Sequence, residues 1–416
     1  MRENNVITGI DIGCTAVRCV IALQNEDMEI EVAGIGTHKC TGHIRQGILV
    51  NAAIAENAIL KAVEEAESIC GLEVNSAFLS ITGLHVRGIL GSSALQIGDN
   101  QGSLSEEITE EDIEEVVEKA GNITLPSGCE VLERTVRDYS FGGFNHLPDP
   151  PVGLRALSIQ ARVYTVYADK TATENLRSVV RKAGIDIEGI IPSAVASGTA
   201  LLNDDERKVG TVVVDIGSAN TDIVIYQGGS PIHLSSFSMG GDRITADFQS
   251  FGISWENAEK LKRTKTAALN SMAEKGTIAV SRVGGRGTVS ITLPVLTQLV
   301  SERVKEIFNF VLEEISASGV DTACLTGGIV ITGGAARMPG IIQAAVEITG
   351  FEVEPGIPRA IKSDSKFVKY PEMATAIGLI KHGLELRKLN GESRNRNRKG
   401  YTDFVTTIKG FFRKLK

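Results

Sequence analysis

The sequence predicts an α/β protein built from two related halves, and three observations lead to this prediction. Expected strands alternate with expected helices along the chain, which is typical of the α/β class. A meander of three short strands occurs once in each half, at 6–35 and at 210–237. Asp11-Ile-Gly-Cys-Thr and Asp215-Ile-Gly-Ser-Ala lie 204 residues apart, a spacing too long for a solenoid repeat but suited to a duplicated domain.

The composition is that of a globular protein with more than one core. The chain has 416 residues, of which 42% are hydrophobic, enough for two or more domains. Its formal net charge is −8. Phosphate contacts along a nucleic acid require a surplus of Lys and Arg, so we expect no nucleic-acid partner.

The cysteines and the N-terminal residues bear on the cellular compartment. The six cysteines form no C-x-x-C pair and no Cys/His cluster, so we expect reduced, structural thiols. Residues 1–5 lack the basic region of a signal peptide. No uncharged apolar stretch reaches the roughly 18 residues that spanning a bilayer requires. We therefore expect a protein that stays inside the cell and does not cross the membrane.

The expected elements can be placed along the chain. The two meanders have strands at 6–12, 16–23 and 29–35, and at 210–216, 221–226 and 232–237. A segment of different character, 82–166, reads as an insertion. Its acidic helix at 109–120 begins with Thr109 and Asp112 at capping-box spacing, and its many Glu residues form a solvated face. Further helices are expected at 171–183, 193–202, 258–270, 296–316, 340–348 and 372–389.

Each Asp-x-Gly motif ends a strand in a tight turn that can hold phosphate. Backbone N–H groups in such a turn point outward, and glycine allows close approach of the ligand. Asp11 and Asp215 are placed to hold Mg²⁺, usually through water. A single turn of this kind is more often a plain β-turn, but two copies can clamp the phosphates of ATP between them.

A third element supports the same site. Residues 331–340, Ile-Thr-Gly-Gly-Ala-Ala-Arg-Met-Pro-Gly, read as a strand, a glycine turn and the start of a helix. Such a turn offers flat backbone for an adenosine and helix N–H groups beside phosphate. A packing turn is the alternative, and the order of the three elements disfavours it.

Taken in order, these motifs resemble the actin, Hsp70 and sugar-kinase superfamily. Within it, three stretches are similar to the FtsA family of bacterial cell-division proteins, namely 191–198 (Ile-Pro-Ser-Ala-Val-Ala-Ser-Gly), 239–242 (Met-Gly-Gly-Asp) and 258–262 (Ala-Glu-Lys-Leu-Lys). The resemblance implies the actin-like two-domain ATPase fold of duplicated ribonuclease-H-like domains, with an inserted 1C-type subdomain and a C-terminal amphipathic helix. The implied boundaries are 1A at 1–81, 167–203 and 359–390, 1C at 82–166, 2A at 204–229 and 316–358, 2B at 230–315, a linker at 391–400 and the amphipathic helix at 401–416.

The resemblance also implies the residues of a nucleotide site. The implied phosphate contacts are Gly13, Cys14, Thr15, Gly217, Ser218 and Asn220, the implied borders of the nucleotide are Gly240 and Gly241, and the implied adenosine contacts are Glu259, Lys262, Gly333, Gly334 and Ala335. On helical spacing alone, Glu259 and Lys262 would more often be a solvated charge pair.

Two departures from the family pattern concern hydrolysis. Cys14 stands where the family often has a hydroxyl residue. Pro192 stands where actins carry a Gln that orients the attacking water, and no acid or amide lies near it in sequence. We assign no catalytic residue and expect slow hydrolysis, far below the median turnover of about 10 per second.

The family resemblance implies partners as well as a ligand. It implies a protein that polymerises like actin, anchors the FtsZ ring to the inner face of the cytoplasmic membrane at the division site, and recruits later division proteins through the 1C-like subdomain. Arg303, on the helix expected at 296–316, would receive the C-terminal peptide of FtsZ. A solvated charge on an amphipathic helix is the other interpretation of Arg303.

The last segment predicts a membrane-binding helix. Residues 391–400 include no apolar residue, which favours a flexible linker. In 401–416 the apolar side chains fall within an arc of roughly 120° on a helix, and packing against the protein's own core is the alternative to a bilayer. The apolar residues are Tyr401, Phe404, Val405, Ile408, Phe411, Phe412 and Leu415, and the basic residues outside the arc are Lys409, Arg413, Lys414 and Lys416.

Two other functions fit the superfamily. A small-molecule kinase would need an acid to accept the proton of the substrate hydroxyl, and the helix at 193–202 contains none. An Hsp70-like chaperone would need a β-rich substrate domain after the ATPase, where this sequence has only a short tail. Both remain alternatives to the division scaffold.

Overall fold

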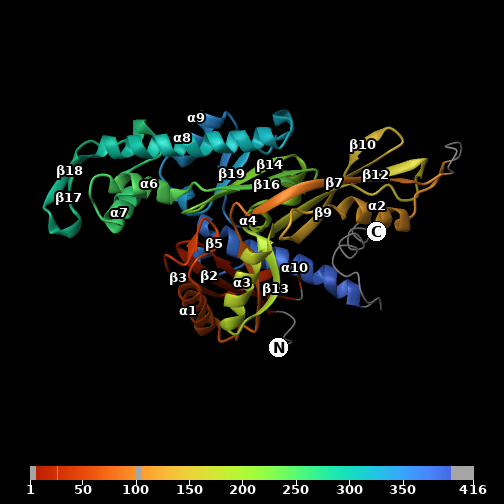
Figure 1. Ribbon diagram of the computed structural model, residues 1–416, viewed down its shortest axis with the longest axis horizontal. Helices are drawn as coiled ribbons and strands as arrows, with labels where there is room; N and C mark the ends of the chain where they lie inside the picture. Colours follow the sequence, from red (N-terminus) through yellow and green to blue (C-terminus); the bar gives the residue numbers. More distant parts are fainter. Residues whose placement is uncertain (1–5, 26, 99–104, 395–416) are drawn as a thin grey trace.

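The protein consists of two lobes, each built on a five-stranded sheet (Figure 1). The computed structural model describes residues 6–25, 27–98 and 105–394. In lobe 1 the strand order is β13-β6-β1-β2-β3, and in lobe 2 it is β16-β15-β14-β19-β20. The strands are β1 (Val6–Ile12), β2 (Ala16–Gln24), β3 (Ile30–Lys39), β6 (Ser76–Ile81), β13 (Asp186–Pro192), β14 (Thr211–Ile216), β15 (Thr221–Gln227), β16 (Ser230–Phe237), β19 (Ile329–Thr332) and β20 (Val353–Pro355).

The two sheets share one topology, which confirms the predicted duplication. In each lobe three consecutive strands form an antiparallel meander, and two later strands add in parallel beside the first strand. The strands are rich in Val and Ile that are buried on both faces, as expected of sheets covered by helices. The two lobes therefore place their first hairpins in equivalent positions.

Helices cover the sheets and join the lobes. Every residue of α4 is buried, because this short helix lies between the lobes and packs against both α10 and the strands β14 and β15. At Gly378 of α10, a Cβ atom would lie 1.7 Å from the carbonyl oxygen of Ala196, so the close crossing of α10 and α4 requires glycine there. The helices are α1 (Ala52–Cys70), α3 (Lys170–Lys182), α4 (Ser193–Leu201), α5 (Asp204–Lys208), α6 (Gly241–Gln249), α7 (Trp255–Lys265), α8 (Leu293–Ala317), α9 (Ile341–Thr349) and α10 (Ala374–Arg394).

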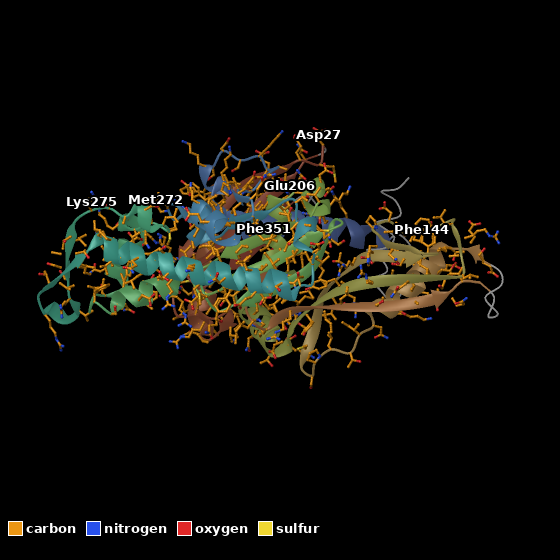
Figure 2. The ribbon with its side chains drawn as sticks, turned by 90° about the horizontal axis from the view of Figure 1, so that it is seen from above. Asp27, Phe144, Glu206, Met272, Lys275 and Phe351 are labelled. Carbon is orange, nitrogen blue, oxygen red and sulfur yellow. The ribbon has the colours of Figure 1, made fainter. Side chains whose placement is uncertain are left out.

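Two extensions project from opposite ends of the molecule. At one end lies the inserted subdomain, whose label Phe144 marks its outer part, and at the other end lies the region of Met272 and Lys275 (Figure 2). The insert has its own sheet, in the order β10-β9-β12-β7, covered on one face by α2, and its own hydrophobic core. Its main elements are β7 (Val86–Gln96), α2 (Glu110–Gly121), β9 (Cys129–Phe141), β10 (Phe144–Leu147) and β12 (Ser158–Asp169).

The capping box predicted for the acidic helix is confirmed. Thr109 precedes α2, its hydroxyl accepts from the backbone N–H of Asp112 at 3.2 Å, and Asp112 in turn accepts from the N–H of Thr109 at 2.8 Å. Ile113, Val116 and Val117 are buried under the sheet. The Glu residues on the other side of the helix are mostly exposed.

Other expectations were wrong or incomplete. The helix expected at 258–270 is α7, which starts at Trp255 and ends at Lys265. Helices α1 and α6 were not expected. Helix α10 continues to Arg394, beyond the expected start of the linker at 391, because a lack of apolar residues rules out burial but not helical hydrogen bonding. The rest of the linker and the amphipathic segment 401–416 lie outside the described residues.

Candidate functional site

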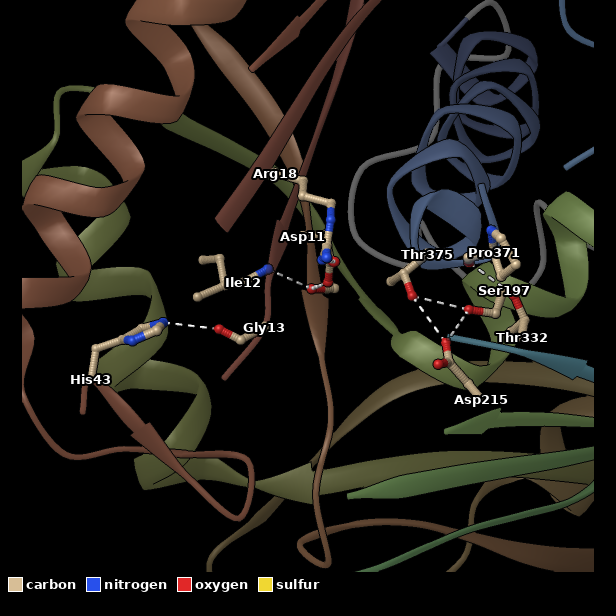
Figure 3. Close-up of polar contacts among 11 residues, drawn as sticks. Asp11, Ile12, Gly13, Arg18, His43, Ser197, Asp215, Thr332, Pro371 and Thr375 are labelled. Carbon is tan, nitrogen blue, oxygen red and sulfur yellow. Dashed lines mark hydrogen bonds and ion pairs between the residues drawn. The ribbon is translucent and has the colours of Figure 1, made fainter. Parts of the chain in front are cut away.

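A deep cleft separates the two lobes, and the two Asp-Ile-Gly turns meet there. Its volume is about 1610 Å³. Both turns line it, together with the Gly333–Gly334 turn and the first residues of α6 and α7. Figure 3 shows Asp11 in contact with Arg18, and Asp215 in contact with Ser197 and Thr375. The duplicated topology thus brings together two motifs that are far apart in sequence.

In lobe 1, Asp11 lies near the end of β1 with both carboxylate oxygens engaged. Its Oδ1 accepts from the Ser80 hydroxyl at 2.9 Å, and its Oδ2 accepts from the Arg18 guanidinium at 3.2 Å. Beyond it the turn closes through the N–H of Gly13, which donates to the carbonyl of Ala16 at 3.1 Å. The carboxylate is therefore fixed in place and partly neutralised by Arg18.

In lobe 2, Asp215 is held by two hydroxyls from helices of the other side of the cleft. Its Oδ2 accepts from Ser197 of α4 at 2.7 Å and from Thr375 of α10 at 3.2 Å. Among the residues that the structure describes, Asp215 has no ion pair comparable to that of Asp11 with Arg18. Burial, together with the negative charge of Asp11, raises the pKa of Asp215 to about 6.

The strand register reveals a further cleft residue, Asp222, that sequence reasoning missed. Asp11 pairs with Arg18 across the first hairpin, and Asp215 pairs with Asp222 across the second. Arg18 and Asp222 are therefore equivalent positions of the duplication, with the same spacing of 204 residues. Had the duplicated offset been extended from the turn into the following strand, it would have singled out Asp222.

Asp222 lies in an environment that disfavours its negative charge. It lines the cleft and accepts from the hydroxyl of Thr82, on the opposite lobe, at 2.5 Å. Burial raises its pKa to about 7, with Asp215 and Asp11 adding to the increase and the hydrogen bond from Thr82 opposing it. Three carboxylates, Asp11, Asp215 and Asp222, thus face one region of the cleft.

The turn after β19 forms a further wall of the cleft. Gly333 has φ of +87°, and a Cβ there would lie 2.4 Å from Oδ1 of Asp215, so only glycine fits. At Gly334 a Cβ would meet no atom within 4 Å, although the residue lines the cleft. The backbone at Gly334 is therefore open to a ligand. Beside it, the guanidinium of Arg337 lies 4.6 Å from the ring centre of Tyr370.

Glu259 and Lys262 are not a solvated pair. Lys262 is 8% exposed, and its Nζ donates to the carbonyl of Gly241 at 2.9 Å and to the hydroxyl of Thr245 at 2.8 Å. It also lies 2.6 Å from Oε2 of Glu259. The hydrogen bonds of Lys262 join α7 to the start of α6, and both side chains of the ion pair line the cleft.

The structure places nearly all of the expected nucleotide contacts on the cleft. Gly240 is the exception, because it lies behind the second turn. A Cβ on Gly240 would be 2.6 Å from the carbonyl oxygens of Gly217 and Ser218, so this glycine packs the turn and does not border the cavity. The expected residues that line the cavity are Asp11, Gly13, Cys14, Thr15, Asp215, Gly217, Ser218, Asn220, Gly241, Glu259, Lys262, Gly333, Gly334 and Ala335.

The donor set fits magnesium held mainly through water and phosphate. Among the described residues, no three Asp, Glu, His or Cys side chains come together as a metal cluster. Asp11 and Asp215 face the cleft as hard oxygen ligands, and Mg²⁺ commonly binds one or two carboxylates while keeping several waters. The acidic cleft would otherwise repel a triphosphate.

Arg303 lies away from the cleft. On α8 it forms ion pairs with Asp247 of α6 at 2.6 Å and with Glu306 at 2.6 Å, and the hydrogen bonds that its guanidinium donates to both carboxylates keep its pKa above the usual value. These residues border a separate depression of about 660 Å³ between α6 and α8. Within the described part of the chain, no helix is both long enough and apolar enough to cross a bilayer.

The fold and the cleft between duplicated lobes define an actin-like protein. A solved structure of the PilM-PilN type IV pilus biogenesis complex superimposes with a TM-score of 0.63 at 17% identity, covering 91% of this chain and 98% of that one. MreB5 of Spiroplasma citri, solved bound to ADP, gives a TM-score of 0.55 at 13% identity, covering 92% and 99%. At these identities the likeness concerns the fold.

Sequence comparison identifies the family. The model of cell division protein FtsA matches residues 212–378, and the model of the SHS2 domain inserted in FtsA matches residues 83–167. The cell division protein FtsA of Pseudomonas aeruginosa is 31% identical over 92% of this chain and 91% of its own length. That of Borreliella burgdorferi is 29% identical over 93% of each. The chain belongs to the FtsA family of cell-division proteins.

The raised pKa of Asp222 predicts how the stability of the protein changes with pH. Its folded pKa, about 7, lies above the ordinary value of 3.8, so the folded state binds more protons than the unfolded state between these values. The contribution of Asp222 to stability therefore falls as pH rises toward 7. Asp222→Asn removes the buried charge, and should raise the free energy of unfolding by about 1–3 kcal/mol at pH 8, by less at pH 5, and change it little below about pH 4.

Thermal unfolding of the nucleotide-free chain at pH 5 and pH 8 measures this difference. Asp364→Asn, at an exposed position on the rim of the cleft, is the matched control and should show no such pH dependence. An Asp222→Asn variant with equal shifts at both pH values would contradict the raised pKa.

Proposed function

We propose that this chain binds ATP with Mg²⁺ in the cleft between its lobes and acts as an actin-like scaffold in cell division. One observation carries the proposal. Two equivalent hairpin turns face each other across the cleft, with Asp11 and Asp215 beside glycine turns and the open backbone of Gly334 on the third side. The structure of MreB5, which has the same fold and is bound to ADP, supports a nucleotide as the ligand.

Each part of the cleft has a role in this proposal. The turns at Gly13 and Gly217 hold the phosphates through their backbone N–H groups. Asp11 and Asp215 hold Mg²⁺ through water. The buried pair of Glu259 and Lys262 meets the ribose and base from lobe 2, and the turn at 333–335 supports the adenosine.

We infer that nucleotide binding, not rapid turnover, is the working property of the cleft. Pro192 ends β13 and is the N-cap residue of α4, and its side chain offers no group to orient an attacking water. Water orientation and general-base assistance supply a large part of the rate in hydrolysis. A scaffold that stays in one nucleotide state for a long time fits this lack better than a metabolic kinase does.

Membership of the FtsA family supports the further role. We propose that the chain anchors the FtsZ ring to the inner face of the cytoplasmic membrane, forms actin-like filaments, and recruits later division proteins through the insert. The membrane contact is assigned to 401–416, whose sequence would place the aromatic and aliphatic residues on one face of a helix and Lys and Arg outside that face. Such a segment orders on an anionic surface, because sixteen residues alone form a marginal helix in water.

The depression on α8 is the proposed place for the FtsZ peptide. Arg303 lies at its border with the apolar Leu299 and several charged residues. Both acidic partners of Arg303 sit on the same surface, so an incoming carboxylate would compete with Asp247 and Glu306 for its guanidinium. Because a new ion pair would replace an existing one, the charge contact alone would add little affinity. The peptide would therefore also have to bury apolar surface in the depression.

Replacing Gly334 tests the nucleotide site. Gly334→Phe should leave the fold intact, because a Cβ there would meet no protein atom within 4 Å, but its ring should fill the space proposed for the adenosine. We expect the affinity for Mg-ATP to fall at least about 100-fold, roughly 2.7 kcal/mol. Trp255 lines the cleft and is the only tryptophan in the chain, so its fluorescence and calorimetry both report binding.

Val346→Phe provides the control, since Val346 lies exposed on α9 and does not line the cleft. It should bind nucleotide like the parent chain. Unchanged affinity in Gly334→Phe would remove the nucleotide from this cleft.

The tail prediction uses co-sedimentation with anionic liposomes. Changing Phe411 and Phe412 to Glu should release the chain from the lipid while nucleotide binding survives, because these rings supply much of the apolar face. Thr406→Glu with Thr407→Glu adds the same charge outside the apolar arc and should retain most of the lipid binding. Persistent sedimentation of the Phe double variant would reassign the tail to protein packing.

The partner prediction concerns Arg303→Glu. Reversing this charge should weaken binding of an FtsZ C-terminal peptide about tenfold or more, roughly 1.4 kcal/mol, without changing nucleotide affinity. Arg282→Glu changes an exposed arginine in the turn between β17 (Thr277–Ser281) and β18 (Thr288–Thr292), and should bind the peptide normally. Equal peptide affinity for both variants would exclude Arg303 from the docking surface.

A further inference from the structure

The inserted subdomain is fastened to both lobes and not only to the lobe from which it emerges. Its first strand, β7, follows Thr82 and its last strand, β12, leads into α3 of lobe 1. The two connections lie together, since the N–H of Asp169 donates to the carbonyl of His85 at 3.3 Å. Such a base alone would let the insert swing as a unit.

Further contacts tie the insert to lobe 1. On β9, Glu130 lies 2.7 Å from Arg177 of α3, and Glu133 lies 3.3 Å from Nε2 of His382 on α10. His382 and Glu133 are both largely shielded from solvent, at 10% and 20% side-chain exposure. Separating a shielded charge pair is costly, because each charge would be left without its partner. The pair therefore holds β9 against α10.

A second set of contacts ties the insert to lobe 2. Strand β16 is the edge strand of the lobe 2 sheet and packs against β7, β9 and β12. The N–H of Leu234 on β16 donates to the Tyr164 hydroxyl of β12 at 2.7 Å, and the Ser230 hydroxyl donates to the carbonyl of Val136 on β9 at 3.0 Å.

Gly88 on β7 leaves room for the Tyr164 contact. A Cβ at Gly88 would lie 1.7 Å from the Tyr164 hydroxyl, so any side chain there would displace it. Tyr164 itself is 4% exposed. The hydroxyl thus reaches a backbone N–H of the other lobe through a space that this glycine provides.

The same strand of lobe 2 leads back to the cleft. On β16, Ser236 pairs in register with Asp222 of β15, two residues beyond Leu234. Asp222 faces the cleft and accepts from Thr82, the residue at which the chain leaves β6 for the insert. A ligand that breaks or strengthens the hydrogen bond between Thr82 and Asp222 would therefore shift two parts of the molecule. One is the base of the insert at Thr82, and the other is β16, the strand that holds the insert.

We propose that the inserted subdomain is coupled to the occupancy of the cleft, through the bond between Thr82 and Asp222 and through the clamp of Tyr164 and Ser230 on β16. Because the insert bridges the lobes, a change of lobe angle moves or strains it. Coupling between two sites is reciprocal, so a partner that grips the insert changes nucleotide affinity by the same factor. The inference rests on the nucleotide site proposed above.

Hydrogen exchange of the full chain, with and without a non-hydrolysable ATP analogue and Mg²⁺, tests the coupling. In the parent chain, addition of nucleotide should change amide exchange in 86–96 and 129–141 about fivefold or more. Tyr164→Phe keeps the ring and removes only the hydroxyl. It should bind nucleotide, as reported by Trp255 fluorescence, while the response of the insert is lost.

Two comparisons guard against loss of folding. Tyr139→Phe removes a hydroxyl from a tyrosine that is also buried in the insert but forms no hydrogen bond with β16. This variant should respond like the parent chain. Ser230→Ala removes the second clamp from the side of lobe 2 and should reduce the response without touching the insert.

The possible results separate the two proposals. Nucleotide binding with no change of exchange in the insert of the parent chain would overturn the coupling alone. A response of Tyr164→Phe and Ser230→Ala equal to that of the parent would overturn the route through β16. No nucleotide binding to the parent chain would overturn the coupling and the nucleotide site together.

Discussion

The hydrogen bonds around Asp215 are the interaction on which the cleft depends. Its carboxylate accepts from Ser197 of α4 and Thr375 of α10, and the two hydroxyls lie 3.0 Å from each other. One acidic side chain at the end of a lobe 2 strand is thereby joined to the two helices that cross between the lobes. Glycines at 378 and 333 give the close approaches that this arrangement requires. The lobes meet where the ligand is expected, so binding and lobe angle share one set of contacts.

The duplication is symmetric in backbone and asymmetric in charge. Arg18 neutralises Asp11 in the first hairpin, whereas Asp222 faces Asp215 in the second. The like charges, added to burial, are the reason that lobe 2 contains the carboxyls with raised pKa values. A bound magnesium ion would lower the repulsion among these carboxylates. This gives a physical reason for the acidic lining of the cleft. The insert is linked to Asp222 through the lobe 2 sheet, because it packs against β16, the strand beside the one that contains Asp222.

Much of the site was predictable from the sequence because its parts are local. The Asp-Ile-Gly turns, the meanders around them and the capping box of α2 depend on residues a few positions apart, and the structure bears them out. The family assignment also followed from motif order, and the family models and relatives confirm it. The interpretation of Glu259 and Lys262 was left open, because helical spacing does not tell whether a charged pair is buried.

The tertiary structure determined which residues face one another. The sequence by itself determined the two turns and their glycines, since a tight turn beside a strand end is set by local backbone preferences. It did not determine that Gly240 packs behind a turn, that Thr82 meets Asp222 across the cleft, or that Tyr164 of the insert reaches β16. The last two contacts join residues 140 and 70 positions apart. Their existence depends on how two sheets and an inserted subdomain pack against one another, which no local pattern records.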